Sequence, residues 1–399
     1  MTQAIEMIAT AAFGLEAVVS RELKALGYTE QTVEDGRISF TGDAAAICRC
    51  NLWLRSADRV LVKMAEFPAQ DFGELFDRTK ELPWADWIPA DGAFPVRGKS
   101  VKSALHSVPD CQRLVKKASV EKLKLTHGDQ WFEETGPDFA VELSLLRARG
   151  TLAIDTSGAG LHKRGYRKLT GRAPLRETLA AALVQLSYWN ADRHLLDPVC
   201  GTGTIPIEAA LIGKNIAPGL LRTFAAERWP IIGETLWKQA REEANDLARR
   251  KLTLQIIGND VDKEALSQAR YHARQVGVEQ DIHFQERPLA EFTSPRKYGC
   301  LIANPPYGER MGEQEEAEAL YREMATVFAP LETWSIYLLT SHPRFEEIYG
   351  KKAGRRRKLY NGRIACTYYQ YPGPRPPRGA DADSARVGES RKSSGGTDG

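Results

Sequence analysis

Apolar and polar positions follow different periods in successive parts of the chain. Near the N-terminus, the apolar residues of 15–28 recur at helical spacing, and Gly27 ends the pattern as a helix terminus commonly does. Residues 37–42 then alternate in the manner of a short strand. We therefore predict that residues 1–65 form a small α+β unit.

A second α+β pattern follows in residues 66–165. Residues 94–99 have the pattern of a strand and residues 111–125 that of an amphipathic helix, while 139–146 and 151–158 alternate as two further strands. A helix packed on such strands makes a compact fold. We predict a second small unit over this range.

From residue 166 the pattern changes to helices that alternate with short apolar strands. The predicted helices cover 178–189, 205–213, 263–277 and 317–330, and the predicted strands cover 194–199, 252–260, 281–286, 298–306 and 334–341. This alternation predicts an α/β unit over residues 166–373, a Rossmann-like doubly wound sheet with ligands at the carboxyl ends of its strands. The Pro-, Gly- and Ser-rich segment 374–399 is expected to be a disordered tail.

Composition and charge exclude several classes of protein. The 399 residues carry a net charge of only +3, so any basic surface must be local, and no run approaches the ~18 apolar residues of a membrane span. Glu6 precedes the apolar stretch 7–15, where a signal peptide carries positive charge. The six cysteines form no CxxC pair and no zinc-like cluster with histidine. We expect reduced, mostly buried thiols, no metal and no membrane contact in a cytoplasmic protein.

A glycine-containing loop joins one predicted strand to the next helix. The sequence DPVCGTGT starts at Asp197, and Gly201 and Gly203 flank Thr202, so the backbone can approach a ligand closely beside the free amides of a helix. Pro206 stands where the dinucleotide fingerprint needs its third glycine, and no phosphate-binding lysine follows. The pattern fits better the DxxxGxG loop of enzymes that bind S-adenosylmethionine.

A carboxylate follows at the end of the next predicted strand. Asp260 can accept hydrogen bonds from both ribose hydroxyls of a nucleoside cofactor. Asp262 is better placed to cap the helix after it, so we assign it a structural role. Taken alone, Gly201 and Gly203 fit an ordinary turn equally well. Together with Asp260 they favour a cofactor site.

The stretch LIANPPYG ends another predicted strand in a carboxamide, two prolines and an aromatic ring. The Asn304 side-chain oxygen and the Pro305 carbonyl can accept the two hydrogens of an exocyclic amine, which becomes a nucleophile only when both are held. Pro305 and Pro306 fix the φ angles that aim the carbonyl, and Tyr307 can stack on a flat target. The alternative is a simple turn, since these residues also form turns. Following a cofactor loop, they predict a site that methylates an amine.

These motifs resemble a known family. DPVCGTGTIPIEAA, GNDVD and NPPYGERMG are similar to the catalytic domain of THUMP-containing RNA methyltransferases, especially the RlmL-type enzymes that methylate the guanine N2 amine in large-subunit ribosomal RNA. FPVRGKSVKSALHSVPDCQRLVKKASVEKLK and TLAIDTSGAGLHKRGYR resemble the RNA-binding THUMP domain, and the first ~65 residues resemble the ferredoxin-like domain before it. APLRETLAAAL, residues 173–183, is similar to the segment that closes over the methionine end of the cofactor.

The resemblance implies a cofactor and a set of contacts. S-adenosyl-L-methionine would be held by Asp197, Gly201, Gly203 and Asp260, and a guanine would be held by Asn304 to Tyr307. Many relatives carry an acidic residue that contacts the adenine amine after the third strand. Here Glu286 or a backbone group would take that place.

Three basic runs provide a separate argument for RNA. Residues 97–124 contain eight Lys and Arg against two acids, a local balance of 8 − 2 = +6, and residues 161–176 and 351–358 contain six Lys and Arg each. Each run alone is typical of a solvated face, and the run at 355–358 also fits a charged loop, but three in a near-neutral chain favour nucleic acid. The candidate RNA contacts are Arg97, Lys99, Lys102, Arg113, Lys116, Lys117, Lys163, Arg164 and Arg167.

The sequence thus predicts an S-adenosylmethionine-dependent methyltransferase that acts on a guanine N2 amine in structured RNA. Ribosomal 23S RNA is the preferred substrate and transfer RNA the alternative, because THUMP enzymes of similar motif modify both. A protein-glutamine methyltransferase would suit the same amine chemistry but needs no basic docking domain. A non-catalytic RNA-binding assembly factor would bind RNA without the cofactor.

Overall fold

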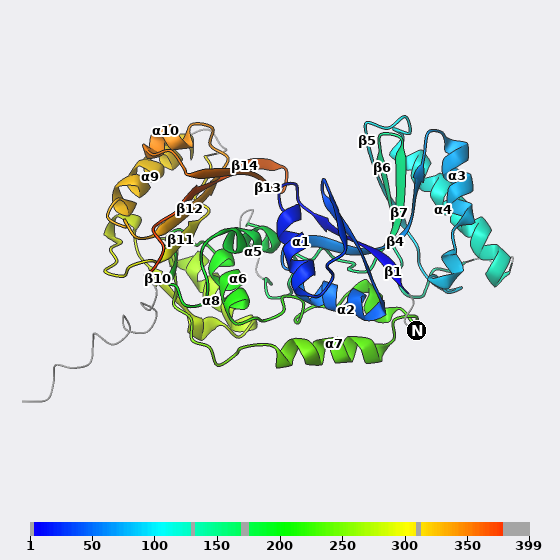
Figure 1. The fold of residues 1–399 in the computed structure, drawn as a ribbon, viewed down its shortest axis with the longest axis horizontal. Helices are drawn as coiled ribbons and strands as arrows, with labels where there is room; N and C mark the ends of the chain where they lie inside the picture. The colour runs from blue at the N-terminus through cyan, green and yellow to red at the C-terminus, as the bar shows by residue number, and fades with distance from the viewer. Residues whose placement is uncertain (1–3, 129–131, 169–174, 309–312, 378–399) are drawn as a thin grey trace, which may run out of the picture.

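The structure is a computed structural model that describes residues 4–128, 132–168, 175–308 and 313–377. Most of the predicted tail, residues 378–399, lies outside this range, as do residues 173–174 and 309–312 of the quoted motifs. Two seven-stranded sheets form the framework of the described residues. The C-terminal sheet lies at the left of the elongated molecule and the N-terminal sheet runs from its centre to its right, with the helix α7 (Glu234–Asp246) beneath the N-terminal sheet (Figure 1).

The N-terminal sheet has the strand order β2-β3-β1-β4-β7-β6-β5. Its strands are β1 (Ile5–Ala11), β2 (Gln31–Glu34), β3 (Arg37–Gly42), β4 (Ala57–Pro68), β5 (Val96–Val101), β6 (Val141–Leu146) and β7 (Arg149–Asp155). Its helices are α1 (Glu16–Ala25), α2 (Ala44–Trp53), α3 (Phe72–Glu81) and α4 (Val108–His127). β4 crosses the boundary predicted between residues 65 and 66 and pairs with both β1 and β7. The first two predicted units therefore share one continuous sheet.

The sequence predicted some of the strands and helices of this N-terminal unit and not others. The predicted helices and strands correspond to α1, β3, β5, α4, β6 and β7. β1 and β4 were not predicted, nor were α2 and α3. β1 lies between two partner strands and is buried at most positions, so its sequence lacks the alternation that marks a half-exposed strand.

The C-terminal sheet has the order β10-β9-β8-β11-β12-β14-β13, with parallel pairing from β10 to β12. Its strands are β8 (Leu195–Asp197), β9 (Ile256–Asp260), β10 (Ile282–Glu286), β11 (Cys300–Ala303), β12 (Ser335–Thr340), β13 (Arg355–Asn361) and β14 (Ile364–Tyr371). Its helices include α5 (Glu177–Leu186), α6 (Thr204–Gly213), α8 (Lys263–Gln275), α9 (Glu313–Phe328) and α10 (Phe345–Tyr349). The predicted doubly wound α/β fold is confirmed.

Within the basic run at 351–358, residues 355–358 are not the charged loop that the sequence allowed. Its second half begins β13, the edge strand, which forms an antiparallel hairpin with β14. β14 in turn pairs antiparallel with β12. The hairpin extends the parallel sheet toward the N-terminal sheet, where it lies near α1 (Figure 1).

The segment between α6 and β9 joins the two halves of the molecule. Its helix α7 packs against α2, where Arg49 pairs with Glu243 at 3.0 Å. Trp229, earlier in the segment, stacks on Phe139 beside β6 with ring centroids 4.6 Å apart. These contacts hold the N-terminal sheet in a defined position beside the C-terminal one.

Two expectations about cysteines and membranes can be compared with the structure. The six cysteines are all buried and none forms a disulfide in the part of the chain that the structure describes, as predicted: Cys48, Cys50, Cys111, Cys200, Cys300 and Cys366. Among the helices of the described residues, none has the length and apolar character that crossing a membrane requires.

Candidate active site

The cofactor loop connects β8 to α6 through two glycines with positive φ. Gly201 has φ +52° and Gly203 has φ +79°, a region that side chains disfavour. A Cβ on Gly203 would lie 2.9 Å from both Ala269 on α8 and Phe284 on β10. A Cβ on Gly201 would meet nothing within 4 Å. Gly203 is thus needed for packing, whereas Gly201 borders open space that a ligand can enter.

Asp260 ends β9 and holds the cofactor loop. One carboxylate oxygen accepts the Gly201 N–H at 2.7 Å, and the other accepts the Asp262 N–H at 3.0 Å. Each oxygen keeps a lone pair for a further donor, which suits the predicted ribose contact. Asp262 caps α8 by accepting the N–H groups of Glu264 and Ala265, so its predicted structural role is confirmed.

The other predicted cofactor residues lie around the same loop. Asp197 is buried and accepts the Val199 N–H at 3.3 Å. Burial raises the pKa of Asp197 well above its usual value, and the nearby Asp260 charge raises it further. The Thr202 carbonyl faces the His272 ring at 3.5 Å. Glu286 ends β10, directly beside Asp260 in the register, and its exposed carboxylate lies 3.4 Å from the ammonium of Lys263.

The NPPY segment leaves the sheet immediately after β11. The Asn304 side-chain oxygen accepts the Tyr307 hydroxyl at 2.5 Å. Tyr321 of α9 donates to the Pro306 carbonyl at 2.6 Å and thereby fixes the second proline. Within the described residues the Pro305 carbonyl has no hydrogen-bond partner. Two acceptors, the Asn304 oxygen and the Pro305 carbonyl, are therefore available to an incoming amine.

Tyr307 lies between this segment and the β13–β14 hairpin. Its ring packs on the catalytic core, and its hydroxyl faces Asn361 and Cys366. Burial raises the pKa of Tyr307, so the phenol stays protonated and can donate to Asn304. Stacking of Tyr307 on a target base remains a prediction. Tyr321 was not singled out in the sequence, although it continues the buried stripe of Ala317 and Met324 on α9.

The topology brings these groups to one edge of the sheet. β8 has β9 on one side and β11 on the other, and all three strands are parallel. Their carboxyl ends therefore place Asp197, Asp260 and Asn304 side by side, at the point where the strand order reverses. Such switch points are where open α/β sheets bind ligands.

Comparison with known proteins identifies the family of this arrangement. The model of the RMKL-like methyltransferase domain (UPF0020) matches residues 164–370. The chain belongs to this family. Models of the RlmL ferredoxin-like domain and the THUMP domain match residues 6–61 and 69–155. The resemblance stated from the sequence is confirmed.

Several similar proteins cover nearly the whole chain. The Bacillus subtilis (strain 168) protein named "Putative RNA methyltransferase YpsC" is 53% identical over 367 residues, 92% of this chain and 95% of that protein. A Listeria monocytogenes structure, described as "a predicted N6-adenine-specific DNA methylase", has 51% identity and a TM-score of 0.89 over 93% of this chain and 97% of that one. The structure of SMU.472, "a putative methyltransferase complexed with SAH", has 44% identity and a TM-score of 0.88 over 94% of this chain and 100% of that one. SAH is the demethylated product of S-adenosylmethionine, which supports the predicted methyl donor.

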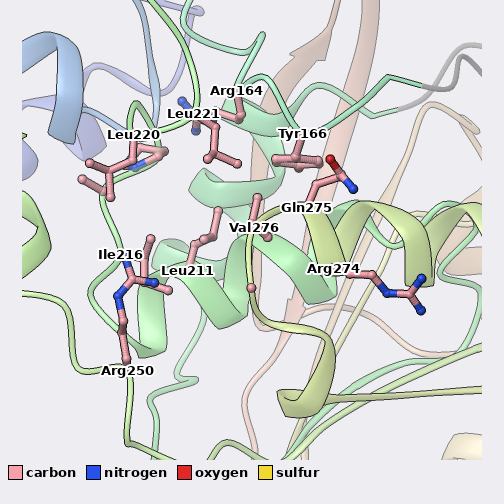
Figure 2. A pocket seen from close by; sticks show the side chains of 13 residues that line it. Arg164, Tyr166, Leu211, Ile216, Leu220, Leu221, Arg250, Arg274, Gln275 and Val276 are labelled. Carbon is pink, nitrogen blue, oxygen red and sulfur yellow. The ribbon is translucent and has the colours of Figure 1, made fainter.

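The structure corrects the predicted RNA contact of Arg164. Its guanidinium is buried, with 3% exposed, and pairs with Glu208 of α6 at 3.3 Å. It also donates to the carbonyls of Leu161 and Arg55. Arg164 borders a cavity of about 300 Å³ between the C-terminal parts of α6 and α8, which Leu211 also lines (Figure 2). A buried and paired guanidinium cannot reach a phosphate, so Arg164 has a structural role.

Arg167 lies beside the cofactor loop. It donates to the hydroxyl of Thr204, the first residue of α6, and lies 3.3 Å from the Glu177 carboxylate. Burial raises the pKa of Glu177, and the Arg167 charge opposes this shift. These contacts link the start of α5 to the loop. In the sequence, Arg167 was singled out only for its positive charge, and Glu177 was not predicted to take part in the site.

The remaining basic candidates lie on two faces of the THUMP region. Arg97 and Lys99 occupy exposed positions of β5, whereas a Cβ on Gly98 between them would lie 3.1 Å from a side chain of α4. Alternation along the strand thus directs Arg97 and Lys99 away from α4. Arg113 and Lys117 are exposed on α4 itself. The two pairs therefore do not form one continuous patch.

Lys116 makes side-chain contacts within the protein, whereas Lys102 and Lys163 form no ion pair within the described residues. Its ammonium donates to the Phe94 carbonyl at 3.1 Å, lies 3.3 Å from the centre of the Phe94 ring and pairs with Glu134. Lys102 and Lys163 are exposed and have no ion pair within the described residues. RNA contact by the exposed lysines and arginines remains a prediction.

In the ranges that the structure describes, no three His, Cys, Asp or Glu side chains gather closely enough to hold a metal ion.

Asp260→Ala should raise the Kd for SAH by about 100-fold, because two charge-assisted hydrogen bonds contribute roughly 1.5 kcal/mol each. Titration calorimetry measures this change directly. Asp262→Ala is the matched control: it removes a carboxylate two residues away that only caps α8, so it should reduce stability and leave the Kd unchanged. An unaltered Kd for Asp260→Ala would contradict the ribose assignment.

The two loop glycines should respond differently to alanine. Gly203→Ala should lower the free energy of unfolding by about 1–3 kcal/mol, because its Cβ collides with Ala269 and Phe284 at positive φ. Gly201→Ala should mainly weaken SAH binding, because its methyl group enters open space. Urea unfolding and calorimetry together separate the two effects. Equal SAH affinity of Gly201→Ala and the native protein would show that the cofactor does not occupy this space.

Proposed function

We propose that the protein transfers a methyl group from S-adenosylmethionine to the exocyclic N2 amine of a guanine in RNA, with 23S ribosomal RNA as its substrate. The cofactor would be held by Asp197, the loop from Gly201 to Gly203, and Asp260, and Glu286 would approach its adenine. S-adenosylmethionine supplies an electrophilic methyl group on a sulfonium centre.

The pair of acceptors at Asn304 and Pro305 carries this proposal. The amine of a nucleobase is planar, and its lone pair is delocalised into the ring. When the Asn304 oxygen and the Pro305 carbonyl accept both hydrogens, the nitrogen becomes more tetrahedral and can attack a methyl group. The same two acceptors stabilise the positive charge that develops on the nitrogen. Because the Tyr307 hydroxyl holds Asn304 and Tyr321 holds Pro306, the acceptors are preorganised before the base arrives.

The choice of RNA is supported by the other domains. The match to a THUMP domain and the name of the Bacillus subtilis relative both favour RNA over a protein substrate. The target base would leave its stack to enter the site, as bases do in enzymes that modify them. A strong salt dependence of RNA binding would accompany this mode.

Nucleoside mass spectrometry tests the proposal. Ribosomal and transfer RNA fractions from a strain that lacks the gene are incubated with the purified protein and labelled S-adenosylmethionine. Labelled N2-methylguanosine in the 23S fraction is the expected result. Label in transfer RNA alone would give the alternative substrate. RNA binding without any transfer would overturn the proposed reaction.

The same experiment addresses a second base. The Listeria monocytogenes structure is described as a predicted N6-adenine-specific DNA methylase, and the adenine N6 amine also offers two hydrogens to a pair of acceptors. Labelled N6-methyladenosine in place of N2-methylguanosine would assign that base. The two products differ in fragmentation, so one measurement distinguishes them.

A further inference from the structure

A second hollow lies where the N-terminal sheet meets the catalytic unit. This seam pocket, about 280 Å³ in volume, is lined by Ala12, Phe13, Leu15, Asp58, Arg176, Thr178, Leu179, Tyr360 and Gly362. The lining residues come from the end of β1, the start of β4, the start of α5 and the β13–β14 hairpin. The hairpin reaches across to the N-terminal sheet near α1 (Figure 1).

Two aromatic side chains, Phe13 and Tyr360, line the seam pocket. Phe13 leaves 51% of its surface exposed, which is unusual for a phenylalanine. Its ring meets Tyr360 edge to face, with centroids 6.0 Å apart. The neighbouring backbone is fixed, because the Arg357 guanidinium donates to the Gly14 carbonyl at 3.1 Å. A Cβ on Gly14 would lie only 2.6 Å from the Lys358 carbonyl, so this contact depends on glycine.

The polar groups of the seam pocket carry both charges. Arg176 is exposed at its rim, and the Lys358 ammonium lies 5.6 Å from the centre of the Tyr360 ring. Asp58 is half-buried, and within the described residues its carboxylate has no hydrogen bond and no ion pair. Burial raises the pKa of Asp58, and the Arg176 charge opposes that shift. The carboxylate is thus an acceptor that faces the pocket without a partner.

Two short chains of contacts connect the seam pocket to the active site. Asn361, the residue after Tyr360, faces the Tyr307 hydroxyl of the NPPY segment. On the other side, Glu177 lies between two lining residues in sequence and pairs with Arg167, which donates to Thr204 at the end of the cofactor loop. Sequence neighbours of the pocket-lining residues thus contact both the NPPY segment and the residues beside the cofactor loop.

This combination of groups fits a single nucleotide of an unpaired strand. Aromatic faces stack on bases of any sequence, and neighbouring cations meet the phosphates. A free carboxylate accepts hydrogen bonds from a base amine or a ribose 2′-hydroxyl. The volume lies just below the range of about 300–1,000 Å³ that holds drug-sized ligands, which suits one base.

We propose that the seam pocket binds one unstacked nucleotide of the RNA strand, next to the base that enters the active site. The base stacks on Phe13 and Tyr360, Asp58 accepts a hydrogen bond from it or from its 2′-hydroxyl, and Arg176 and Lys358 meet the backbone. This inference rests on the proposed function in taking the ligand to be RNA. Its location and its aromatic contacts are tested independently of any methyl transfer.

Binding of a defined probe tests the seam pocket. The probe is a fluorescein-labelled single-stranded RNA of 12 nucleotides, titrated with the full-length protein in the presence of SAH. Phe13→Ala and Tyr360→Ala should each raise the Kd about 10-fold or more, since stacking on one side chain is worth roughly 1–3 kcal/mol per base. Phe13→Trp keeps a stacking face and should restore binding, whereas Phe13→Leu should not.

Tyr188→Ala is the matched control. Tyr188 is 57% exposed and lies just beyond the C-terminal end of α5, away from the lining residues at its start. Its removal should leave the RNA affinity unchanged. Calorimetry with SAH checks that each variant is folded, because none of the altered side chains belongs to the cofactor loop.

A second measurement needs no variant. The same RNA carrying 4-thiouridine is irradiated with the native protein, and the crosslinked peptides are identified by mass spectrometry. Crosslinks at Phe13 or Tyr360 are expected. Three results would each overturn the proposed nucleotide site. They are unchanged RNA affinity of both alanine variants, crosslinks confined to other surfaces, and failure of the native protein to bind the probe.

The outcomes for the seam pocket and for the proposed function can be told apart. If the probe binds through Phe13 and Tyr360 but no guanine is methylated, the nucleotide site in the seam pocket is supported and the proposed reaction is refuted. If guanine is methylated but both alanine variants keep the native probe affinity and the native kcat/KM, the proposed reaction is supported and the nucleotide site in the seam pocket is refuted.

Discussion

Asn304→Ala should lower kcat for methyl transfer to RNA by about 10²–10³-fold, the loss seen when one preorganised polar group is removed from a transition state. The Asn304 oxygen is one of the two acceptors that hold the amine, and alanine leaves that hydrogen unpaired. The Kd for SAH should stay unchanged, because the cofactor loop rests on Asp260 and not on Asn304. Single-turnover transfer from labelled S-adenosylmethionine measures the rate.

Two variants make this test specific to the acceptor. Asn304→Asp keeps an oxygen at the same position and should retain more activity than Asn304→Ala. Tyr307→Phe removes the 2.5 Å hydrogen bond that orients the Asn304 oxygen, so it should lower kcat by about 10-fold, less than the loss of the oxygen itself. Native turnover in Asn304→Ala would refute the assigned role.

Glu208→Ala should lower the free energy of unfolding by about 3–5 kcal/mol, because it leaves a buried guanidinium without its counter-charge. Arg164 lies 3.3 Å from Glu208, and both side chains are almost fully buried. Tyr166 also donates to the same carboxylate at 3.3 Å and would lose its acceptor. Burial lowers the pKa of the neighbouring Arg55 to about 10, and the Glu208 charge opposes this shift, so a second buried cation would lose its stabilisation. Urea unfolding followed by circular dichroism measures the change.

The matched control is a surface pair with similar geometry. Glu279 lies 2.7 Å from Arg274, whose side chain is largely exposed. Glu279→Ala should change stability by at most about 1 kcal/mol, as exposed ion pairs do. Similar losses for Glu208→Ala and Glu279→Ala would show that the Arg164 pair does not stabilise the fold.

Local sequence patterns predicted most of the strands and helices of the catalytic unit. The strands that became β8 to β12 are short apolar runs between helices, and their order along the chain was enough to predict a doubly wound sheet. The Asp262 cap was predicted correctly because a cap depends only on the backbone of the next few residues. Asp260 and Asn304 were likewise singled out from their positions at strand ends, because open α/β sheets bind ligands at the carboxyl ends of their strands.

Charge was a poorer guide than apolar spacing. The run from 161 to 176 has no acid, and its cations were expected to face RNA. Arg164 is instead buried against Glu208, which is 44 residues away, and Arg167 is bound to Thr204 of the cofactor loop. A side chain's charge does not reveal whether a distant carboxylate neutralises it. The run at 355–358 similarly became part of an edge strand, since its pairing partner β14 lies beyond it in sequence.

Sequence patterns alone established the fold class and predicted a cofactor loop and an amine-binding segment, because each depends on the conformation and burial of a few neighbouring residues. Only the assembled chain decided that β4 joins two predicted units into one sheet and that Gly201 is held by Asp260. The contact between the rings of Phe13 and Tyr360 across the seam also became visible only in the tertiary structure. These features join segments far apart in sequence, and periodicity reports how each segment is buried but not what covers it.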